Sequence, residues 1–281
     1  MLFTAMVINI INIDMKIGFF DSGLGGLYIA RAVHKMLPQY DYVYLGDTLH
    51  LPYGKRSRDT VYQLTQRAVE YLFTQQDCQL IIIACNTASA LALRKLQQGW
   101  LAAHYPERRV LGVIVPTLEH TIEHNHKNIG MIATEAMASS GIYEEELRKL
   151  SPDIALHSVS APLLVPLLEH EGEAFLDQAL SMYIEPLVTK NIDALILGCT
   201  HYCLLKSRIE RLYPYRFDII SQDEIIPPKI TDYLRRHPEI DGLLSKGHSS
   251  HYEVTDISQS FQKNAHDIIG DNVDIALASY V

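Results

Sequence analysis

Two cysteines each follow a run of apolar residues and precede small hydrogen-bonding residues. Residues 81–84 lead into Cys85, Asn86 and Thr87, and residues 195–198 lead into Cys199, Thr200 and His201. Such apolar runs are typical of buried parallel strands, and α/β proteins bind ligands at the carboxyl ends of those strands. Two thiols at strand ends predict a pair of acid/base groups facing one small polar substrate. The alternative, that both cysteines are inert core residues, stays open on this evidence alone.

The thiol is suited to proton transfer. Its ordinary pKa of about 8.5 allows it to act as a base and as an acid within one reaction cycle. Both cysteines precede expected helices, whose N-termini favour the thiolate, and His201 could orient or protonate Cys199. Cys199, His201 and Cys203 also offer three soft ligands to zinc. Since no fourth ligand is evident and the spacing is not a common zinc pattern, we expect no metal.

Other candidates for the site lie at turns. Asp21 and Ser22 follow the first apolar run and precede a glycine-rich turn, where they could supply a carboxylate beside a thiol and a donor to a substrate carboxylate. An ordinary helix cap would explain them equally. Tyr53 and Gly54 could form the wall of a small pocket, or simply a restricted turn. Glu169 follows a long apolar stretch and could reach into a crevice, although a solvated helix residue is commoner.

Apolar strand-like runs alternate with amphipathic helical stretches, which predicts an α/β fold with mostly parallel sheets. Strands are expected at 17–20, 42–45, 81–84, 110–115, 128–132, 154–159, 193–197, 251–255 and 273–276, with helices over 27–36, 57–74 and 226–236.

The strand order predicts two α/β lobes with the active site in the crevice between them. Three strands before residue 110 are few for a stable sheet, so we expect the chain after residue 222 to return to it. This gives a first lobe of residues 15–110 plus 223–281 and a second lobe of residues 111–222. Residues 1–14 are interpreted as an N-terminal extension or a misassigned start, because they lack the basic region and cleavage site of a signal peptide.

Composition limits the classes of function. The net charge of −9 over 281 residues argues against a nucleic-acid-binding surface. The apolar N-terminal run is too short to cross a bilayer, so no membrane association is expected. Four cysteines are too few for a disulfide scaffold, and a reducing cytoplasm is the simplest location.

Five ordered motifs carry a specific family resemblance. They are Phe20-Asp21-Ser22-Gly23-Leu24-Gly25-Gly26, Leu45-Gly46-Asp47-Thr48, Pro52-Tyr53-Gly54, Ala84-Cys85-Asn86-Thr87-Ala88 and Leu197-Gly198-Cys199-Thr200-His201-Tyr202. From residue 16 onward the chain resembles the glutamate racemases of the aspartate/glutamate racemase superfamily. The family has two α/β domains and uses no cofactor, so the resemblance implies none here.

The resemblance also implies the reaction and its residues. One cysteine thiolate removes the α-proton of glutamate and the other thiol protonates the opposite face, with Cys85 serving the D-enantiomer and Cys199 the L-enantiomer. Asp21 is expected near the first thiol, and His201 and Glu169 near the second. The residues expected to hold the substrate are Asp21, Ser22, Tyr53, Gly54, Asn86, Thr87, Thr134, Thr200 and His201. The implied role is supply of D-glutamate for peptidoglycan, and we expect a homodimer.

Four departures from the family pattern bear on specificity. Val115 precedes Pro116 where a glutamate is usual, Ala161 replaces a cysteine, and Cys203 replaces a proline. Met137 stands where a second threonine is expected near the substrate, which predicts weaker binding of glutamate that Met137→Thr should restore. A racemase for aspartate or another amino acid is the nearest alternative, and a catalytically weak binding protein is the alternative from another class.

Overall fold

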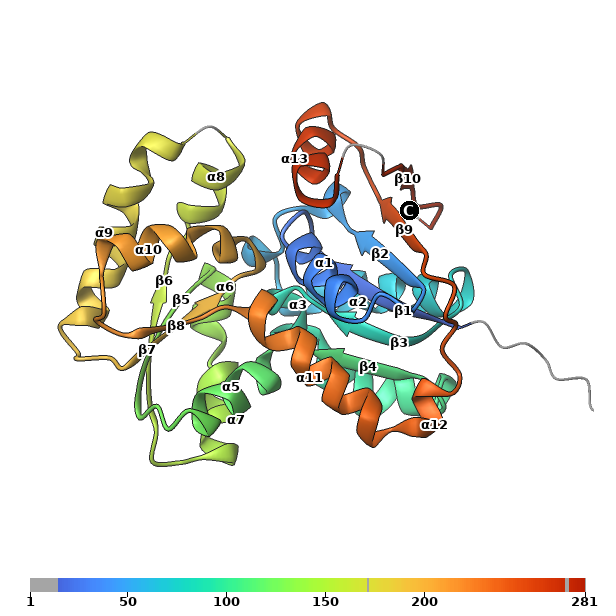
Figure 1. Ribbon diagram of the computed structural model, residues 1–281, viewed down its shortest axis with the longest axis horizontal. Helices are drawn as coiled ribbons and strands as arrows, with labels where there is room; N and C mark the ends of the chain where they lie inside the picture. The colour runs from blue at the N-terminus through green and yellow to red at the C-terminus, as the bar shows by residue number, and fades with distance from the viewer. Residues whose placement is uncertain (1–14, 171, 271–272, 281) are drawn as a thin grey trace, which may run out of the picture.

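The computed structural model describes residues 15–170, 172–270 and 273–280, and the extension predicted for residues 1–14 lies outside them. The described chain forms two parallel β-sheets that lie side by side, each covered by helices (Figure 1). The first sheet has the order β10-β9-β2-β1-β3-β4, and the second has the order β6-β5-β7-β8. The predicted α/β class with mostly parallel sheets is therefore confirmed.

The first sheet is buried on both faces. Its strands are β1 (Lys16–Asp21), β2 (Tyr42–Gly46), β3 (Cys78–Ile83), β4 (Arg109–Gly112), β9 (Ser250–Val254) and β10 (Ile275–Leu277). Successive side chains of a strand point to opposite faces. Phe19 accordingly packs with α1 (Gly26–Met36), α11 (Gln222–Arg236) and α13 (Gln259–Ile269). Phe20 packs on the other face with α2 (Arg58–Thr74) and the helical segment of residues 86–104.

The second sheet consists of β5 (Asn128–Ala133), β6 (Ala155–Ser160), β7 (Ala194–Gly198) and β8 (Asp218–Ile220). One face packs against α5 (Ile114–Glu123), α6 (Glu135–Ser140) and α7 (Ile142–Leu150), in the same core cluster that contains α2. The other face packs against α8 (Leu164–Glu169), α9 (Leu176–Val188) and α10 (Lys206–Leu212). None of the helices in the described part of the chain is long and apolar enough to cross a membrane.

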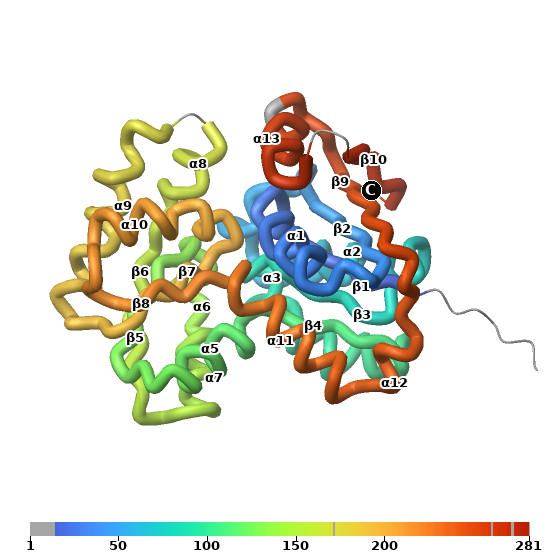
Figure 2. The backbone as a smooth tube through the Cα atoms, in the orientation of Figure 1, coloured from blue at the N-terminus to red at the C-terminus, as the bar shows by residue number. Residues whose placement is uncertain are grey.

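The chain passes between the two sheets twice, from β4 into α5 and from β8 into α11 (Figure 2). These crossings correct one expectation. The apolar run 110–115 is expected to form one strand, but β4 ends at Gly112 and pairs with β3 in the first sheet, and α5 begins at Ile114. The first residues of α5 are apolar like those of β4, so composition alone does not show where the strand ends and the helix begins. The helix expected from residue 226 begins earlier, at Gln222, and includes Pro227 and Pro228.

All strand pairs of both sheets are parallel, so the carboxyl ends of a sheet lie along one edge. β1 ends at Asp21, β3 ends two residues before Cys85, and β7 ends directly before Cys199. The residues that the sequence singles out therefore lie at the edges of two different sheets. Strands β9 and β10 extend the first sheet beyond β2, which brings the C-terminal segment to the same edge.

Candidate active site

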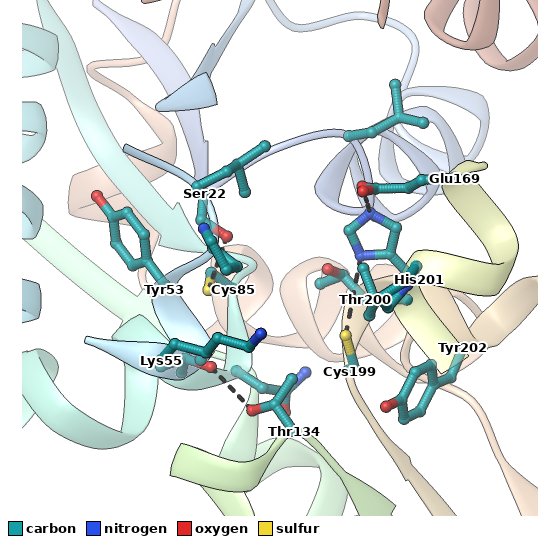
Figure 3. A pocket seen from close by; sticks show the side chains of 18 of the residues that line it. Ser22, Tyr53, Lys55, Cys85, Thr134, Glu169, Cys199, Thr200, His201 and Tyr202 are labelled. Carbon is teal, nitrogen blue, oxygen red and sulfur yellow. Dashed lines mark hydrogen bonds and ion pairs between the residues drawn. The ribbon is translucent and has the colours of Figure 1, made fainter. Parts of the chain in front are cut away.

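A cavity of about 430 Å³ lies between the two sheets, and both Cys85 and Cys199 line it (Figure 3). Its walls come from the strand ends, from the loop of residues 48–55 and from α8. Residues of the C-terminal segment between 256 and 264 complete it. The volume is in the range of small-molecule sites.

Cys85 is almost fully buried at the end of β3 and caps the short helix α3 (Asn86–Ala88). Its Sγ lies 3.5 Å from Ser22 Oγ and accepts a hydrogen bond of 3.5 Å from the backbone N–H of Ala88. Burial, together with the negative charge of Asp21, raises the pKa of the Cys85 thiol to about 12, although the two hydrogen bonds oppose the change. Cys85 is therefore a protonated thiol at neutral pH.

Cys199 has a different partner. Its Sγ lies 3.8 Å from Nδ1 of His201, and Nε2 of the same ring lies 2.9 Å from a carboxylate oxygen of Glu169 (Figure 3). Burial alone would lower the pKa of His201, but its contacts with Cys199 and Glu169 and their charges raise it to about 10. Burial would raise the pKa of Glu169, but the contact with His201 lowers it. Glu169 and His201 thus form an ion pair beside Cys199.

Asp21 connects the two halves of the site. Its carboxylate is completely buried, accepts a 2.8 Å hydrogen bond from the N–H of Gly23, and accepts a 3.2 Å hydrogen bond from the hydroxyl of Thr200. Burial raises its pKa, although the charge of His201 and the hydrogen bonds oppose the change. Gly25 allows the close approach of the two segments, because a Cβ there would collide with Thr200 and lie 2.8 Å from the backbone nitrogen of His201.

Tyr53 and Gly54 lie on the 3₁₀ turn η2 (Tyr53–Lys55) at the cavity wall. The ring of Tyr53 is buried, and its hydroxyl donates a 2.6 Å hydrogen bond to Asp47. Asp47 also accepts a 2.9 Å hydrogen bond from Thr255 and lies 2.8 Å from the ring of His50. Asp47 therefore fixes the 48–55 loop to the C-terminal segment, a role for which its motif gave no signal.

Thr87 and Thr134 face each other across the gap between the sheets. Their hydroxyl oxygens are 3.3 Å apart, and both residues line the cavity. The Thr134 hydroxyl also accepts a hydrogen bond from the N–H of Met137 and so caps α6. The pair is one of the direct contacts between the elements of the two sheets.

Asn86 borders the cavity, but its side chain is engaged in what we call the amide network, which consists of Asn86, Thr117, Tyr143 and Gln222. Asn86 donates a 2.7 Å hydrogen bond to Gln222 and accepts hydrogen bonds from Gln222 and Tyr143 at 3.0 and 2.9 Å. Gln222 also donates to Thr117 at 3.2 Å. The network joins α3 and α7 to α5 and the start of α11, the two helices at which the chain crosses between the sheets. Apart from Asn86, its members were missed, because no local pattern distinguishes them.

The structure corrects the interpretation of Met137. Its side chain is fully buried in the hydrophobic core and is absent from the walls of the cavity. The prediction that Met137→Thr would restore a contact with the substrate therefore loses its basis. Cys203 also lies outside the cavity, and its thiol donates to the carbonyl of Thr200. Within the described residues, no group of three or more His, Cys, Asp or Glu side chains is arranged to hold a metal ion.

The C-terminal wall of the cavity was not foreseen. Asp256, Phe261 and Asn264 line it from the segment that contains α13. This segment is held in place where Thr48 donates a 2.6 Å hydrogen bond to the carbonyl of Asp256. No motif marks these residues, and their position follows only from the pairing of β9 with β2.

Comparisons with known proteins agree with this geometry. A family model described as Asp/Glu/Hydantoin racemase matches residues 28–222. A glutamate racemase of Dinoroseobacter shibae is 37% identical over 243 residues, which cover 82% of this chain and 87% of the relative. A glutamate racemase of Sulfurihydrogenibium sp. is 35% identical over 263 residues, which cover 92% and 95%.

Solved structures give the same result. A glutamate racemase isoform from Bacillus anthracis superimposes with a TM-score of 0.83 at 31% identity, over 94% of this chain and 97% of that one. The glutamate racemase from Francisella tularensis in complex with D-glutamate has a TM-score of 0.83 at 30% identity, over 95% and 98%.

The chain belongs to the Asp/Glu/Hydantoin racemase family. It is an amino-acid racemase, and the predicted resemblance to the glutamate racemases is confirmed.

Proposed function

We propose that this protein interconverts L-glutamate and D-glutamate by proton transfer between the substrate α-carbon and two cysteines. The observation that carries the proposal is the pair of buried thiols, Cys85 and Cys199, at the ends of strands from two different sheets and on the walls of one cavity. Glutamate is the substrate named for the relatives in the comparisons, and one related structure holds D-glutamate.

The reaction needs a base on one face of the α-carbon and an acid on the other. A thiolate takes the α-proton, the electron pair of the broken C–H bond remains on the α-carbon, and the second thiol then protonates that carbon from the opposite face. Each turnover leaves the first cysteine as a thiol and the second as a thiolate. Fixed hydrogen-bond donors must stabilise the carbanion, and the hydroxyl of Thr87 and the backbone N–H groups at the two strand ends can supply them.

The surroundings of the two thiols support different starting roles. Cys85 is a neutral thiol next to Ser22, because burial raises its pKa to about 12. Cys199 lies beside the protonated ring of His201, which Glu169 supports as an ion pair. A thiolate at Cys199 is attracted to that imidazolium. These surroundings favour a start in which Cys199 removes a proton from L-glutamate and Cys85 delivers one.

The remaining parts of the proposal rest on the family resemblance and on position. The residues proposed to hold the substrate are Asp21, Ser22, Tyr53, Gly54, Asn86, Thr87, Thr134, Thr200 and His201. The proposed biological role is supply of D-glutamate for peptidoglycan by a cytoplasmic homodimer. The proposed lobes, residues 15–110 with 223–281 and residues 111–222, contribute one thiol each.

The test is an isotope experiment. In D₂O, circular dichroism and mass spectrometry of L-glutamate incubated with the protein should show early product that carries deuterium while the remaining substrate stays unlabelled. Cys85→Ser and Cys199→Ser should each abolish racemisation, since a hydroxyl is a far poorer base near neutral pH. With a substrate analogue that has a β-leaving group, Cys199→Ser should act on the D-form and Cys85→Ser on the L-form, because elimination needs one base.

Three outcomes would refute the proposal. Equal labelling of substrate and product would show that a single base works on both faces. Racemisation that survives the loss of either thiol would exclude the two-cysteine mechanism. Turnover of aspartate or another amino acid in place of glutamate would be compatible with the two-cysteine mechanism but would show that glutamate is not the substrate.

A further inference from the structure

Acidic side chains outnumber lysine and arginine side chains on the walls of the cavity. Glu135, Glu169 and Asp256 line it, and Lys55 is the one lysine or arginine among the described lining residues. The positive charge of His201 is balanced by Glu169 at 2.9 Å. A dicarboxylic amino acid brings two carboxylates and one ammonium group, so its second carboxylate needs a cation that no neighbour already neutralises.

Lys55 meets that requirement. Lys55 differs from lysines such as Lys206 and Lys229, whose ammonium groups lie within 4 Å of glutamate carboxylates. Lys55 has no ion pair with any described residue. Its side chain is exposed, and Figure 3 shows it directed from η2 towards the interior of the cavity. An unpaired and solvated ammonium group can bind a carboxylate without breaking an existing contact.

The backbone that carries Lys55 is fixed. Tyr53, two residues earlier, is anchored by its hydrogen bond to Asp47, and the N–H of Arg56 donates a 3.0 Å hydrogen bond to the carbonyl of Tyr53. Gly54 packs so closely on the other half of the site that an added Cβ would lie 3.1 Å from the Cβ of Thr134. Arg56 is not a competitor, because its Nε donates to the carbonyl of His50.

The position of Lys55 indicates which carboxylate it reaches. The proposed two-base reaction requires the α-carbon to lie between the sulfur atoms of Cys85 and Cys199, at the strand ends. Lys55 instead borders both this cavity and a neighbouring open depression of about 370 Å³, so it lies at the rim. The distal end of an amino-acid side chain, not its α-carboxylate, extends towards that rim.

We propose that Lys55 is a specificity-determining residue that binds the side-chain carboxylate of the substrate and selects dicarboxylic amino acids over their uncharged isosteres. This inference rests on the proposed function. Because the ammonium group is solvated, its attraction for the substrate is screened by salt. The contact operates in binding and leaves the proton transfers to the two cysteines.

The test compares Lys55→Met, which keeps the length of the side chain, with Lys55→Arg, which keeps the charge. Lys35→Met is the matched control, since Lys35 is an exposed lysine on α1 that does not line the cavity. The measurements are KM and kcat for both enantiomers of glutamate, and the inhibition constant of D-glutamine, which has the same shape without the charge. Each is taken at low and high salt.

In Lys55→Met we expect the KM for glutamate to rise about tenfold, because one charge-assisted hydrogen bond is lost. The inhibition constant of D-glutamine should change less than about twofold, kcat should be retained, and the salt dependence of KM should flatten. Lys55→Arg should restore most of the affinity, and Lys35→Met should behave as the wild type.

An unchanged KM for glutamate in Lys55→Met, or equal weakening of glutamate and D-glutamine, would overturn this inference while the wild-type racemisation of glutamate stands. Failure of the wild-type protein to racemise glutamate would instead overturn the proposed function.

Discussion

The ion pair between Glu169 and His201 should set the alkaline limit of activity. His201 is the partner of Cys199, and its pKa of about 10 depends on the contacts with Cys199 and Glu169, which overcome the opposing effect of burial. The side chains of His201 and Glu169 are only 7% and 24% exposed, so water screens the pair weakly. Replacing Glu169 by Gln keeps the shape and removes the charge.

The size of the effect follows from the loss of one charged contact. Hydrogen bonds to charged groups contribute about 1.5–3 kcal/mol, and each pH unit corresponds to about 1.4 kcal/mol. In Glu169→Gln the basic limb of the kcat/KM profile should therefore move to lower pH by about 1–2 pH units. At pH 7 most of the imidazolium remains, so the loss of activity should be modest there and large near pH 9.

The assay is circular dichroism of each glutamate enantiomer between pH 6.5 and 10. Glu173→Gln is the matched control, because Glu173 is an exposed glutamate that pairs with Arg208 and does not line the cavity. A basic limb that stays in place while activity falls uniformly would refute the assigned role of Glu169. So would the same displacement in Glu173→Gln.

The thermal stability of the protein should also depend on the ion pair between Glu169 and His201. The pKa of His201 in the folded protein, about 10, lies above its ordinary value of 6.5. The stabilisation that protonation provides is thus fully present below pH 6.5 and is lost as the pH rises towards 10. The decrease of Tm over this window should be smaller in Glu169→Gln than in the wild type.

Three further predictions follow from packing. Met137→Thr should lower the free energy of unfolding by about 2–4 kcal/mol, because the Met137 side chain is in the core. Urea denaturation measures this loss, and initial rates should show no improvement in KM. A lower KM would contradict the prediction. Gly25→Ala should reduce kcat/KM at least about tenfold by displacing Thr200. The control Gly99→Ala should leave kcat/KM unchanged, because an added Cβ there meets nothing within 4 Å. Equal effects of the two substitutions would contradict the prediction. Tyr143→Phe should cost about 1–3 kcal/mol of stability in urea, since the buried carbonyl of Asn86 loses one of its two donors and the amide of Gln222 loses an acceptor. An unchanged midpoint would count against the network.

The sequence predicts the strand ends well because the signal there is local. An apolar run followed by Cys85 or Cys199 combines a buried strand with a polar end, and both features are visible within seven residues. Ser57, which caps α2, likewise marks the start of the expected helix. The boundary between β4 and α5 is hidden because both elements are apolar where they meet, so periodicity cannot separate them.

The parts of the site that could not be predicted depend on contacts between distant segments. Gln222 and Asn86 are 136 positions apart and meet only because the chain returns from β8 to the first sheet. Asp47 and Thr255 meet because β9 pairs with β2. Met137 was misjudged for a related reason: its place beside Thr134 in the sequence suggested the cavity, but the first turn of α6 directs it into the core.

The unequal surroundings of the two thiols are compatible with a reaction that has no preferred direction. The enantiomers of glutamate have equal free energies in water, so kcat/KM must be the same in both directions however different the two bases are. The protonated His201 beside Cys199 and the neutral thiol of Cys85 can therefore make kcat and KM differ between the enantiomers only in compensating proportions. Glu169→Gln changes one half of the site alone, yet it must lower kcat/KM for L- and D-glutamate equally, because the ratio of the two specificity constants is the equilibrium constant of the reaction, which no substitution changes. The difference between the two halves of the site can therefore be measured in the separate kcat and KM values of the enantiomers, in isotope exchange and in one-base reactions. It cannot be measured in the ratio of the two kcat/KM values.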